Sequence, residues 1–309
     1  MFGVCEILRI FAEKSSLMRY GIVGTGAIGG FYGSKLAYSG QEVHFLSHSD
    51  YQFVKEHGIQ VDSCDGSFHL DHVNVYQYAA DMPKCDVVIV GLKTTNNHLL
   101  ADLLPPLFLE HTVVVLIQNG IGVEADVQKM FPHVQLIAGL AFICSAKTEP
   151  GRVNHQCYGS INLANYSCQD ESVFTAILND FINGGIQAGS VPYDEARWKK
   201  AVWNMPFNGM TVALNTQTDL LLKNPATRQL IRDLMGEVVG AARHLGVTGL
   251  DEAFIDKMIE MTDEMTHYSP SMKLDYDFHR PMEIYYIYSR PIQIAREAGF
   301  PMPKLEMLE

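Results

Sequence analysis

The sequence lacks a long apolar run and a surplus of basic residues. No stretch of ~18 consecutive apolar residues is present, which is the shortest run that can cross a membrane as a helix. The chain has 23 Lys and Arg against 35 Asp and Glu, a formal net charge of −12. Nucleic acids and anionic membranes attract basic surfaces. We therefore expect a cytoplasmic protein with neither a nucleic-acid nor a membrane partner.

The cysteines and histidines also lack the spacing that metal sites use. The 6 Cys and 12 His include no C-x-x-C pair and no H-E-x-x-H motif. Disulfide frameworks are typical of short secreted chains, whereas this chain has 309 residues. The sequence thus predicts reduced thiols and no metal site.

The length and the 47% hydrophobic content indicate two globular domains. Residues 1–17 mix charged residues into an apolar run, which argues against a secretory signal, and we interpret them as an N-terminal extension. Near Pro192 the sequence pattern changes again, from alternating strands and helices to helices alone. We predict a dinucleotide-binding domain over residues 18–192 and a mostly helical domain over residues 193–309.

The first domain alternates short apolar strands with helices. Apolar runs of this length are typical of strands buried in a parallel sheet with helices on both faces. The fold class is therefore α/β, with a Rossmann-type doubly wound sheet. The predicted strands are 20–23, 43–46, 86–90 and 113–117, and the first helix is 27–39.

The second domain shows apolar residues at helical spacing and no competing alternation. Pro206 falls inside the first of its helices, where proline is expected to kink or interrupt the helix. The predicted helices are 194–213, 225–245, 252–266 and 281–298.

A glycine-rich loop joins the first strand to the first helix. In this context the first glycine permits a tight turn, the second lets the backbone approach a pyrophosphate, and the third lets helix and strand pack closely. The helix N-terminus adds free N–H groups and a positive dipole end. The alternative is a turn without a ligand. The predicted cofactor-binding residues are Gly24, Thr25, Gly26, Ala27, Ile28 and Gly29.

The end of the second strand indicates which cofactor is bound. An acidic residue there favours NADH, and a basic residue favours NADPH. The strand is followed by Ser47, His48 and Ser49, which can hydrogen-bond a 2′-phosphate, and Asp50 comes too late to bind the ribose. We predict NADPH over NADH, with His48 as a cofactor contact.

Two further loops follow apolar strands, at the sheet edge where ligands bind in open α/β sheets. The loop of residues 91–94 contains Lys93, and the loop of residues 118–122 contains Asn119. Alone, the lysine could be a solvated charge and the asparagine part of a turn. Their shared position favours ligand contacts.

Lys200, Asn204 and Asn208 lie four residues apart and so share one face of the predicted helix. This face could simply meet water. A partly desolvated lysine can instead have a lowered pKa and serve as a proton donor, which carbonyl reduction requires. Asparagines can hold substrate oxygens without adding charge.

Two further candidates lie near the C-terminal end. Ser271 follows a Ser-Pro turn signal, and Glu283 is placed at the opening of the last predicted helix. A carboxylate there also suits the helix dipole, which is the alternative explanation for Glu283.

Together these motifs resemble the ketopantoate reductase (2-dehydropantoate 2-reductase) family, over nearly the whole chain from Met18 to Glu309. The glycine loop resembles the family's N-terminal fingerprint, Leu92-Lys93 its lysine segment, and Asn119-Gly120 its asparagine-glycine loop. The remaining matches are Lys200-x-x-x-Asn204-x-x-x-Asn208 and the twelve-residue spacing from Ser271 to Glu283.

The resemblance implies a role for each residue. Lys200 would protonate the C2 oxygen of ketopantoate as NADPH delivers hydride, and Glu283 would orient the cofactor ribose or a substrate hydroxyl. Asn119, Asn204, Asn208 and Ser271 would hold substrate. Asn119, Lys93 and Ser145 would contact the cofactor.

The sequence departs from the family at two positions and leaves alternatives open. His48 stands where arginine is frequent, and Thr218 falls near a further family asparagine. The alternatives are a β-hydroxyacid dehydrogenase or another 2-keto acid reductase, and a non-catalytic NADP-binding regulator. The expected assembly is a monomer or homodimer.

Overall fold

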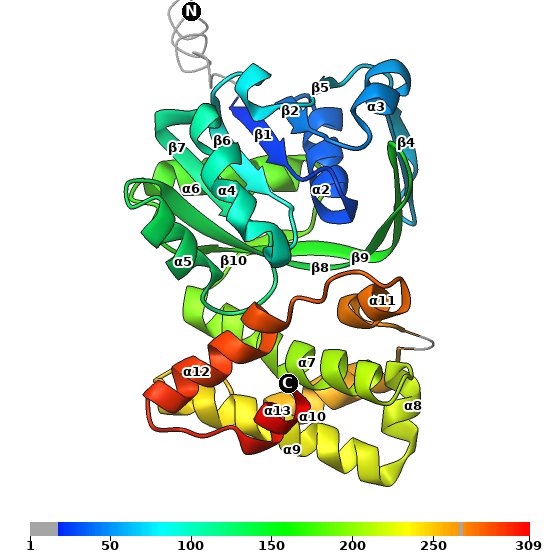
Figure 1. Cartoon of the computed structure of the whole chain (residues 1–309), viewed down its shortest axis with the longest axis vertical. Coiled ribbons are helices and arrows are strands. Elements are labelled where there is room, and N and C mark those ends of the chain that lie inside the picture. Colours follow the sequence, from blue (N-terminus) through cyan, green and yellow to red (C-terminus); the bar gives the residue numbers. More distant parts are fainter. Residues whose placement is uncertain (1–17, 266–267) are drawn as a thin grey trace, which may run out of the picture.

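The protein has a sheet-bearing part stacked on a helical part, as Figure 1 shows. The structure is a computed structural model that describes residues 18–265 and 268–309. The N-terminal extension predicted over residues 1–17 lies outside the described residues. Among the helices described, none is long and apolar enough to cross a membrane.

The sheet has the strand order β4-β3-β9-β8-β7-β6-β1-β2-β5, and β10 pairs with β9. The pairs from β5 through β8 are all parallel. The chain runs outward from β1 to β2 and β5, then crosses back to β6 and continues to β7 and β8. The order thus reverses between β1 and β6, which is where open α/β sheets bind ligands. The strands are β1 (Arg19–Val23), β2 (Glu42–Leu46), β3 (Ile59–Ser63), β4 (Phe68–Leu70), β5 (Asn74–Tyr76), β6 (Cys85–Val90), β7 (Phe108–Leu116), β8 (Gln135–Glu149), β9 (Arg152–Asn165) and β10 (Ala188–Ser190).

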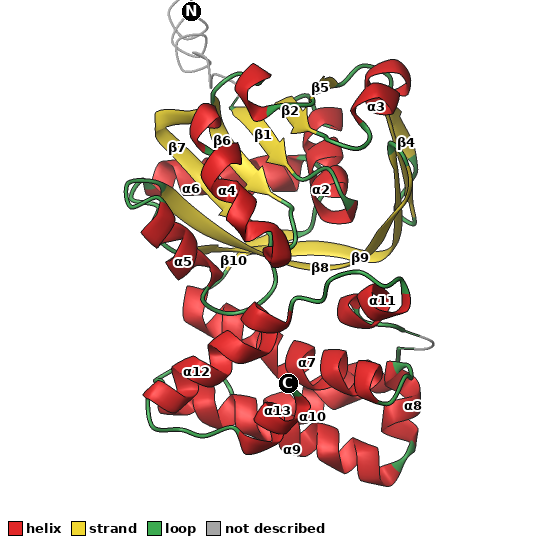
Figure 2. Ribbon diagram, viewed as in Figure 1, coloured by secondary structure: helices red, strands yellow, loops and turns green. Residues whose placement is uncertain are grey.

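Helices cover both faces of this sheet, as Figure 2 shows. Successive residues of a strand point to opposite faces. Val87 and Ile89 of β6 pack in one apolar cluster with residues of α2 and α6, and Val88 and Val90 pack in another with residues of α4 and α5. The predicted doubly wound sheet is confirmed. The helices are α2 (Ala27–Tyr38), α3 (Tyr51–His57), α4 (Leu100–Leu103), α5 (Val123–Met130) and α6 (Glu171–Asn183).

The long hairpin of β8 and β9 was not foreseen from the sequence. Its strands pair antiparallel over most of their length, with register shifts at three places. In Figure 1 the two strands lie along the side of the sheet-bearing part that faces the helical part. The hairpin therefore supplies one wall of the region between the two parts.

The helical part has its own apolar core, built mainly on α7 and α9. Ile121, from the loop after β7, is buried in this core, so that loop joins the two parts. The helices are α7 (Tyr193–Ala213), α8 (Thr218–Lys223), α9 (Pro225–His244), α10 (Glu252–Asp263), α11 (Ser271–Asp277), α12 (Arg290–Glu297) and α13 (Pro303–Leu308), with a π-helical turn, η4 (Tyr285–Ser289).

Three predictions about this part were wrong in detail. Helix α7 runs through Pro206 without interruption, because Pro206 is buried and its neighbours Met205 and Phe207 pack in the helical core. Helix α10 ends at Asp263, before the predicted end. The helix predicted over residues 281–298 begins after Glu283 and contains a π-helical turn, and α13 follows it. Glu283 therefore does not open the last helix.

Candidate active site between the two parts

The glycine loop between β1 and α2 has two glycines held by packing and one that faces open space. Gly24 has φ +96°, and a Cβ there would lie 2.7 Å from the backbone nitrogen of Leu92. A Cβ on Gly29 would lie 2.2 Å from the carbonyl oxygen of Gly24. A Cβ on Gly26 would meet no atom within 4 Å. The backbone at Gly26 is thus open to approach by a ligand.

The N-terminus of α2 is suited to an anion. Gly26 provides no side-chain cap, and the first turn holds no acidic residue, so the N–H groups and the dipole are not neutralised locally. The Thr25 hydroxyl donates to the Leu46 carbonyl at 2.9 Å, and the Ser145 hydroxyl donates to the Ala27 carbonyl at 3.4 Å. Ile28 packs against the apolar core. The glycine loop is therefore tied both to the end of β2 and to β8.

At the end of β2, His48 is exposed, whereas Asp50 is buried and bound by other residues. The Asp50 carboxylate pairs with Lys147 and accepts hydrogen bonds from the Gly151 N–H at 3.1 Å and the Ser49 hydroxyl at 2.8 Å. Burial acts to raise the pKa of Asp50, but these partners outweigh it and hold the pKa below its usual value. The one carboxylate in this segment is thus committed to the β8–β9 turn.

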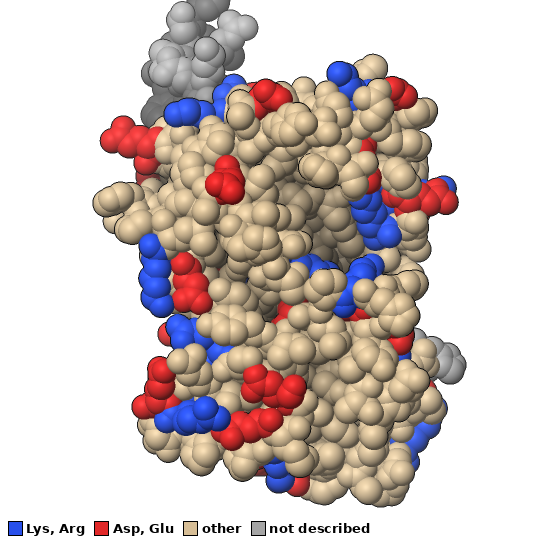
Figure 3. All heavy atoms as spheres, viewed as in Figure 1, with Lys and Arg blue, Asp and Glu red and all other residues tan. Residues whose placement is uncertain are grey.

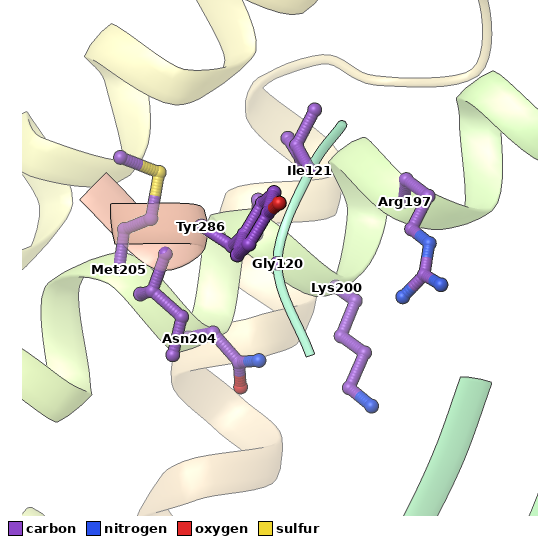
Figure 4. A pocket seen from close by; sticks show the side chains of 9 residues that line it. Gly120, Ile121, Arg197, Lys200, Asn204, Met205 and Tyr286 are labelled. Atoms are coloured by element: carbon purple, nitrogen blue, oxygen red, sulfur yellow. The ribbon is translucent and has the colours of Figure 1, made fainter. Parts of the chain in front are cut away.

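Helix α7 presents Lys200 and Asn204 to the pocket between the two parts. The two side chains extend in the same direction in Figure 4, which agrees with their spacing of one helical turn. The Lys200 ammonium donates a hydrogen bond to the Ala141 carbonyl of β8 at 2.8 Å. The pocket is lined by Gly120, Ile121, Arg197, Lys200, Ala201, Asn204, Met205, Tyr286 and Ile287.

Lys200 has an altered acidity. Burial, and next the nearby Arg197 guanidinium, lower its pKa to about 7, while Glu283 acts in the opposite direction. The residue is half-buried and lines the pocket. A lysine with this pKa is present in both protonation states near neutral pH and can therefore give up a proton.

Glu283 reaches the loop after β6. Its Oε1 accepts two hydrogen bonds from Thr94, one from the backbone N–H and one from the hydroxyl, both at 2.8 Å. The carboxylate is buried, at 6% exposure. It therefore caps a loop of the sheet-bearing part rather than its own helix.

Lys93, in the same loop, pairs with the buried Asp275 of α11. Asp275 also pairs with Arg280, with 3.0 Å between Oδ1 and Nε. The loop of residues 92–94 is thus joined to the helical part at two points, through Asp275 and through Glu283.

Asn208 binds the start of α11, next to Ser271 in the chain. The buried Asn208 accepts a hydrogen bond on Oδ1 from the Met272 N–H at 3.1 Å, and Ser271 is exposed beside it. Thr218 donates to the Tyr268 carbonyl through its N–H at 3.1 Å and through its hydroxyl at 3.2 Å. Asn208 and Thr218 thus hold the chain on either side of Ser269 and Pro270.

Figure 3 shows that one face is hollowed between the two parts, with Lys and Arg side chains gathered beside the hollow. This local positive charge contrasts with the net charge of −12. It favours an anionic ligand, because nearby charges outweigh distant ones.

Sequence reasoning missed the residues that connect these loops: Thr94, Gln118, Glu124, Arg197, Asp275 and Tyr286. They act through contacts between segments far apart in the chain. Only Thr94 and Gln118 have a sequence signal, since Thr94 follows Lys93 and Gln118 precedes Asn119.

One group in the described residues brings metal-ligand types together, on the β3–β4 turn and β9. Ligand atoms of Cys64, Asp65 and His155 lie within 4.8 Å of one another. Both His155 ring nitrogens already have partners, the Ser63 hydroxyl at 2.8 Å and the Tyr158 carbonyl at 3.1 Å. These bonds account for the histidine without a metal.

The comparisons with known proteins point to one family. The model described as ketopantoate reductase PanE/ApbA matches residues 20–167, and its C-terminal counterpart matches residues 193–309. The 2-dehydropantoate 2-reductase of Nostoc sp. (strain PCC 7120) is 43% identical over 299 residues, which is 94% of this chain and 92% of that protein.

Two crystal structures of proteins with the same name superpose well. The protein from Geobacter metallireducens GS-15 has a TM-score of 0.91 at 37% identity, covering 94% of this chain and 97% of that one. The protein from Methylococcus capsulatus has a TM-score of 0.86 at 33% identity, covering 94% of both chains.

Proposed function

This chain belongs to the ketopantoate reductase family, and we propose that it reduces 2-dehydropantoate (ketopantoate) to pantoate with NADPH, a reaction of pantothenate biosynthesis. The similarity to proteins named 2-dehydropantoate 2-reductase at 43%, 37% and 33% identity supports the reaction. The observation that carries the proposal is Lys200, which lies in the pocket with its pKa lowered to about 7.

The cofactor would bind along the glycine loop. The open space at Gly26 and the uncapped N-terminus of α2 fit a pyrophosphate, with Gly24, Thr25, Ala27, Ile28 and Gly29 forming the rest of the loop. NADPH rather than NADH is favoured because Asp50 is committed to Lys147 while His48 stays exposed. When bound, the cofactor supplies hydride to C2 of the substrate.

Lys200 would supply the proton that carbonyl reduction requires. As C2 gains hydride, negative charge develops on its oxygen, and the Lys200 ammonium transfers a proton to that oxygen to leave a 2-hydroxy acid and a neutral amine. The Ala141 carbonyl, which accepts the Lys200 bond at 2.8 Å, holds the ammonium in place beforehand.

The remaining residues would orient the two ligands. Asn204 and Asn119 offer amides to substrate oxygens, and Ser271 offers a hydroxyl from the start of α11. Asn208 acts on the same site through the helix it holds at Met272. Lys93, Ser145 and Glu283 would contact the cofactor side, with Glu283 fixed by Thr94. We assign cofactor binding to residues 18–192 and substrate binding to residues 193–309.

The test is the rate of NADPH oxidation with ketopantoate, compared with NADH and with other 2-keto acids, with the product identified by chromatography. Pantoate formed with NADPH as the preferred cofactor is the expected result. Preference for another 2-keto acid would replace the substrate and keep the reaction. If no 2-keto acid is reduced but β-hydroxy acids are oxidised with NADP⁺, a β-hydroxyacid dehydrogenase is favoured, and binding of NADPH without turnover in either direction would favour a regulator.

A further inference from the structure

Arg197 forms a buried ion pair that crosses between the two parts. Its guanidinium, on α7, pairs through Nη2 with Glu124 on α5, and the two side chains are 2% and 0% exposed. The other oxygen of Glu124 accepts a hydrogen bond from the Tyr193 hydroxyl at 2.7 Å. Apolar residues of similar volume can stabilise such a position as well as a buried ion pair does. Stability alone therefore does not account for the pair.

The second contact of Arg197 reaches the loop of Asn119. Nη1 donates to the Gln118 carbonyl at 2.7 Å. The Gln118 side chain, itself buried, donates to the Leu92 carbonyl at 2.8 Å and to Asn97 Oδ1 at 2.7 Å. Gln118 thus joins the two loops that follow β6 and β7, and Arg197 joins Gln118 to α7.

Arg197 also lies three residues before Lys200 on α7, and the two side chains line the same pocket in Figure 4. We propose that Arg197 is a positioning residue, which fixes Lys200 relative to the loops of Lys93 and Asn119 by binding Gln118 and Glu124 at once. A planar guanidinium suits this task, because it can donate in two fixed directions where a lysine ammonium acts as a point charge.

Charge provides a second connection between the two residues. After burial, the guanidinium of Arg197 is the next largest cause that lowers the pKa of Lys200, and Glu283 opposes it from the segment before η4. Glu124 and Tyr193 face Arg197 from α5 and from the first turn of α7. Replacing Arg197 should therefore change the pKa of Lys200 as well as its position.

The experiment compares two variants and a control. Arg197→Met alone would leave Glu124 buried without a cation, so the charge is removed in the pair Arg197→Met with Glu124→Gln. Arg197→Lys keeps the charge but can reach only one of the two partners. The control is Lys199→Ala. Lys199 is the neighbouring cation on α7, and it pairs with Glu195 on the same helix.

The pKa of Lys200 is measured without any substrate, from the pH dependence of its resonance after reductive ¹³C-methylation, assigned by its loss in Lys200→Arg. In the double variant we expect this pKa to rise by about one unit. In Arg197→Lys we expect little change in the pKa and a kcat about tenfold lower, because the Gln118 contact is weakened. Lys199→Ala should match the native protein in both.

The proposal is overturned if the double variant folds with an unchanged Lys200 pKa and Arg197→Lys also keeps kcat within about twofold of native. Arg197 would then support the fold without positioning Lys200. If the double variant does not fold, Arg197→Lys decides alone, and a kcat within about twofold of native would overturn the proposal. The inference rests on the proposed function. If the native protein reduces no 2-keto acid but the pKa of Lys200 still shifts in the double variant, the proposed function is overturned and the assignment of Arg197 stands.

Discussion

Thr94 donates two hydrogen bonds to one oxygen of Glu283, each 2.8 Å long, and so joins the loop after β6 to the segment before η4. Both residues are buried, at 6% exposure each. The carboxylate is therefore fixed by a partner 189 residues away in the sequence. This relationship makes Glu283 part of a shared site rather than a helix cap.

Thr94→Val should lower kcat/KM for ketopantoate by about tenfold, because it removes one of two bonds to a charged group. Steady-state kinetics measures the change. The control is Thr112→Val, a buried threonine whose hydroxyl donates to the Cys85 carbonyl near the other end of the sheet. It should leave kcat/KM unchanged. Equal losses in the two variants would show that Thr94 has no special effect on the site.

The pH dependence of kcat/KM should have a descending limb near the pKa of Lys200, about 7. As a proton donor, Lys200 must be protonated, so activity is lost as pH rises through this value. Glu283 raises the pKa of Lys200, so Glu283→Gln should move the limb to lower pH by about one unit. A limb that stays in place in Glu283→Gln would remove this electrostatic link.

Gly26→Ala and Gly29→Ala should separate binding from folding. A methyl group on Gly26 meets no atom within 4 Å, so that variant should fold normally and bind NADPH about tenfold more weakly. A methyl group on Gly29 would lie 2.2 Å from the Gly24 carbonyl, so that variant should lose about 1–3 kcal/mol of stability. Denaturant unfolding and fluorescence titration give the two numbers. Native affinity in Gly26→Ala would place the pyrophosphate elsewhere.

His48→Ala should weaken binding of NADPH by about tenfold and leave NADH unchanged, because a 2′-phosphate contact is worth roughly 1.5 kcal/mol. Titration of nicotinamide fluorescence with both cofactors measures the difference. Ser49→Ala is a useful control, since its hydroxyl already donates to Asp50 at 2.8 Å. Equal weakening for NADPH and NADH would contradict a 2′-phosphate contact at His48.

Features with a local signal could be predicted from the sequence. The glycine loop, the apolar strands of the parallel sheet and the spacing of Lys200 and Asn204 all depend on residues close together in the chain. The structure brings Lys200 and Asn204 into one pocket with Gly120.

Features that depend on distant pairs could not be predicted. Arg197 pairs with Glu124 at a separation of 73 residues, and neither residue belongs to a local motif. Pro206 was expected to kink or interrupt its helix, but α7 continues through it within the surrounding core, which is tertiary packing overriding local propensity. Likewise, the length of the β8–β9 hairpin depends on backbone pairing along both strands and not on the residues of its turn.

The most direct test of the central proposal is a single-turnover measurement of NADPH oxidation by ketopantoate in the native protein and in Lys200→Met, with Lys199→Ala as control. We predict that hydride transfer in Lys200→Met is slower by ~10²–10⁴-fold while the Kd for NADPH stays within about twofold of native. Lys199→Ala should behave as native. A Lys200→Met rate close to native would contradict the assignment of Lys200 as the proton donor, and with it the mechanism built on this site.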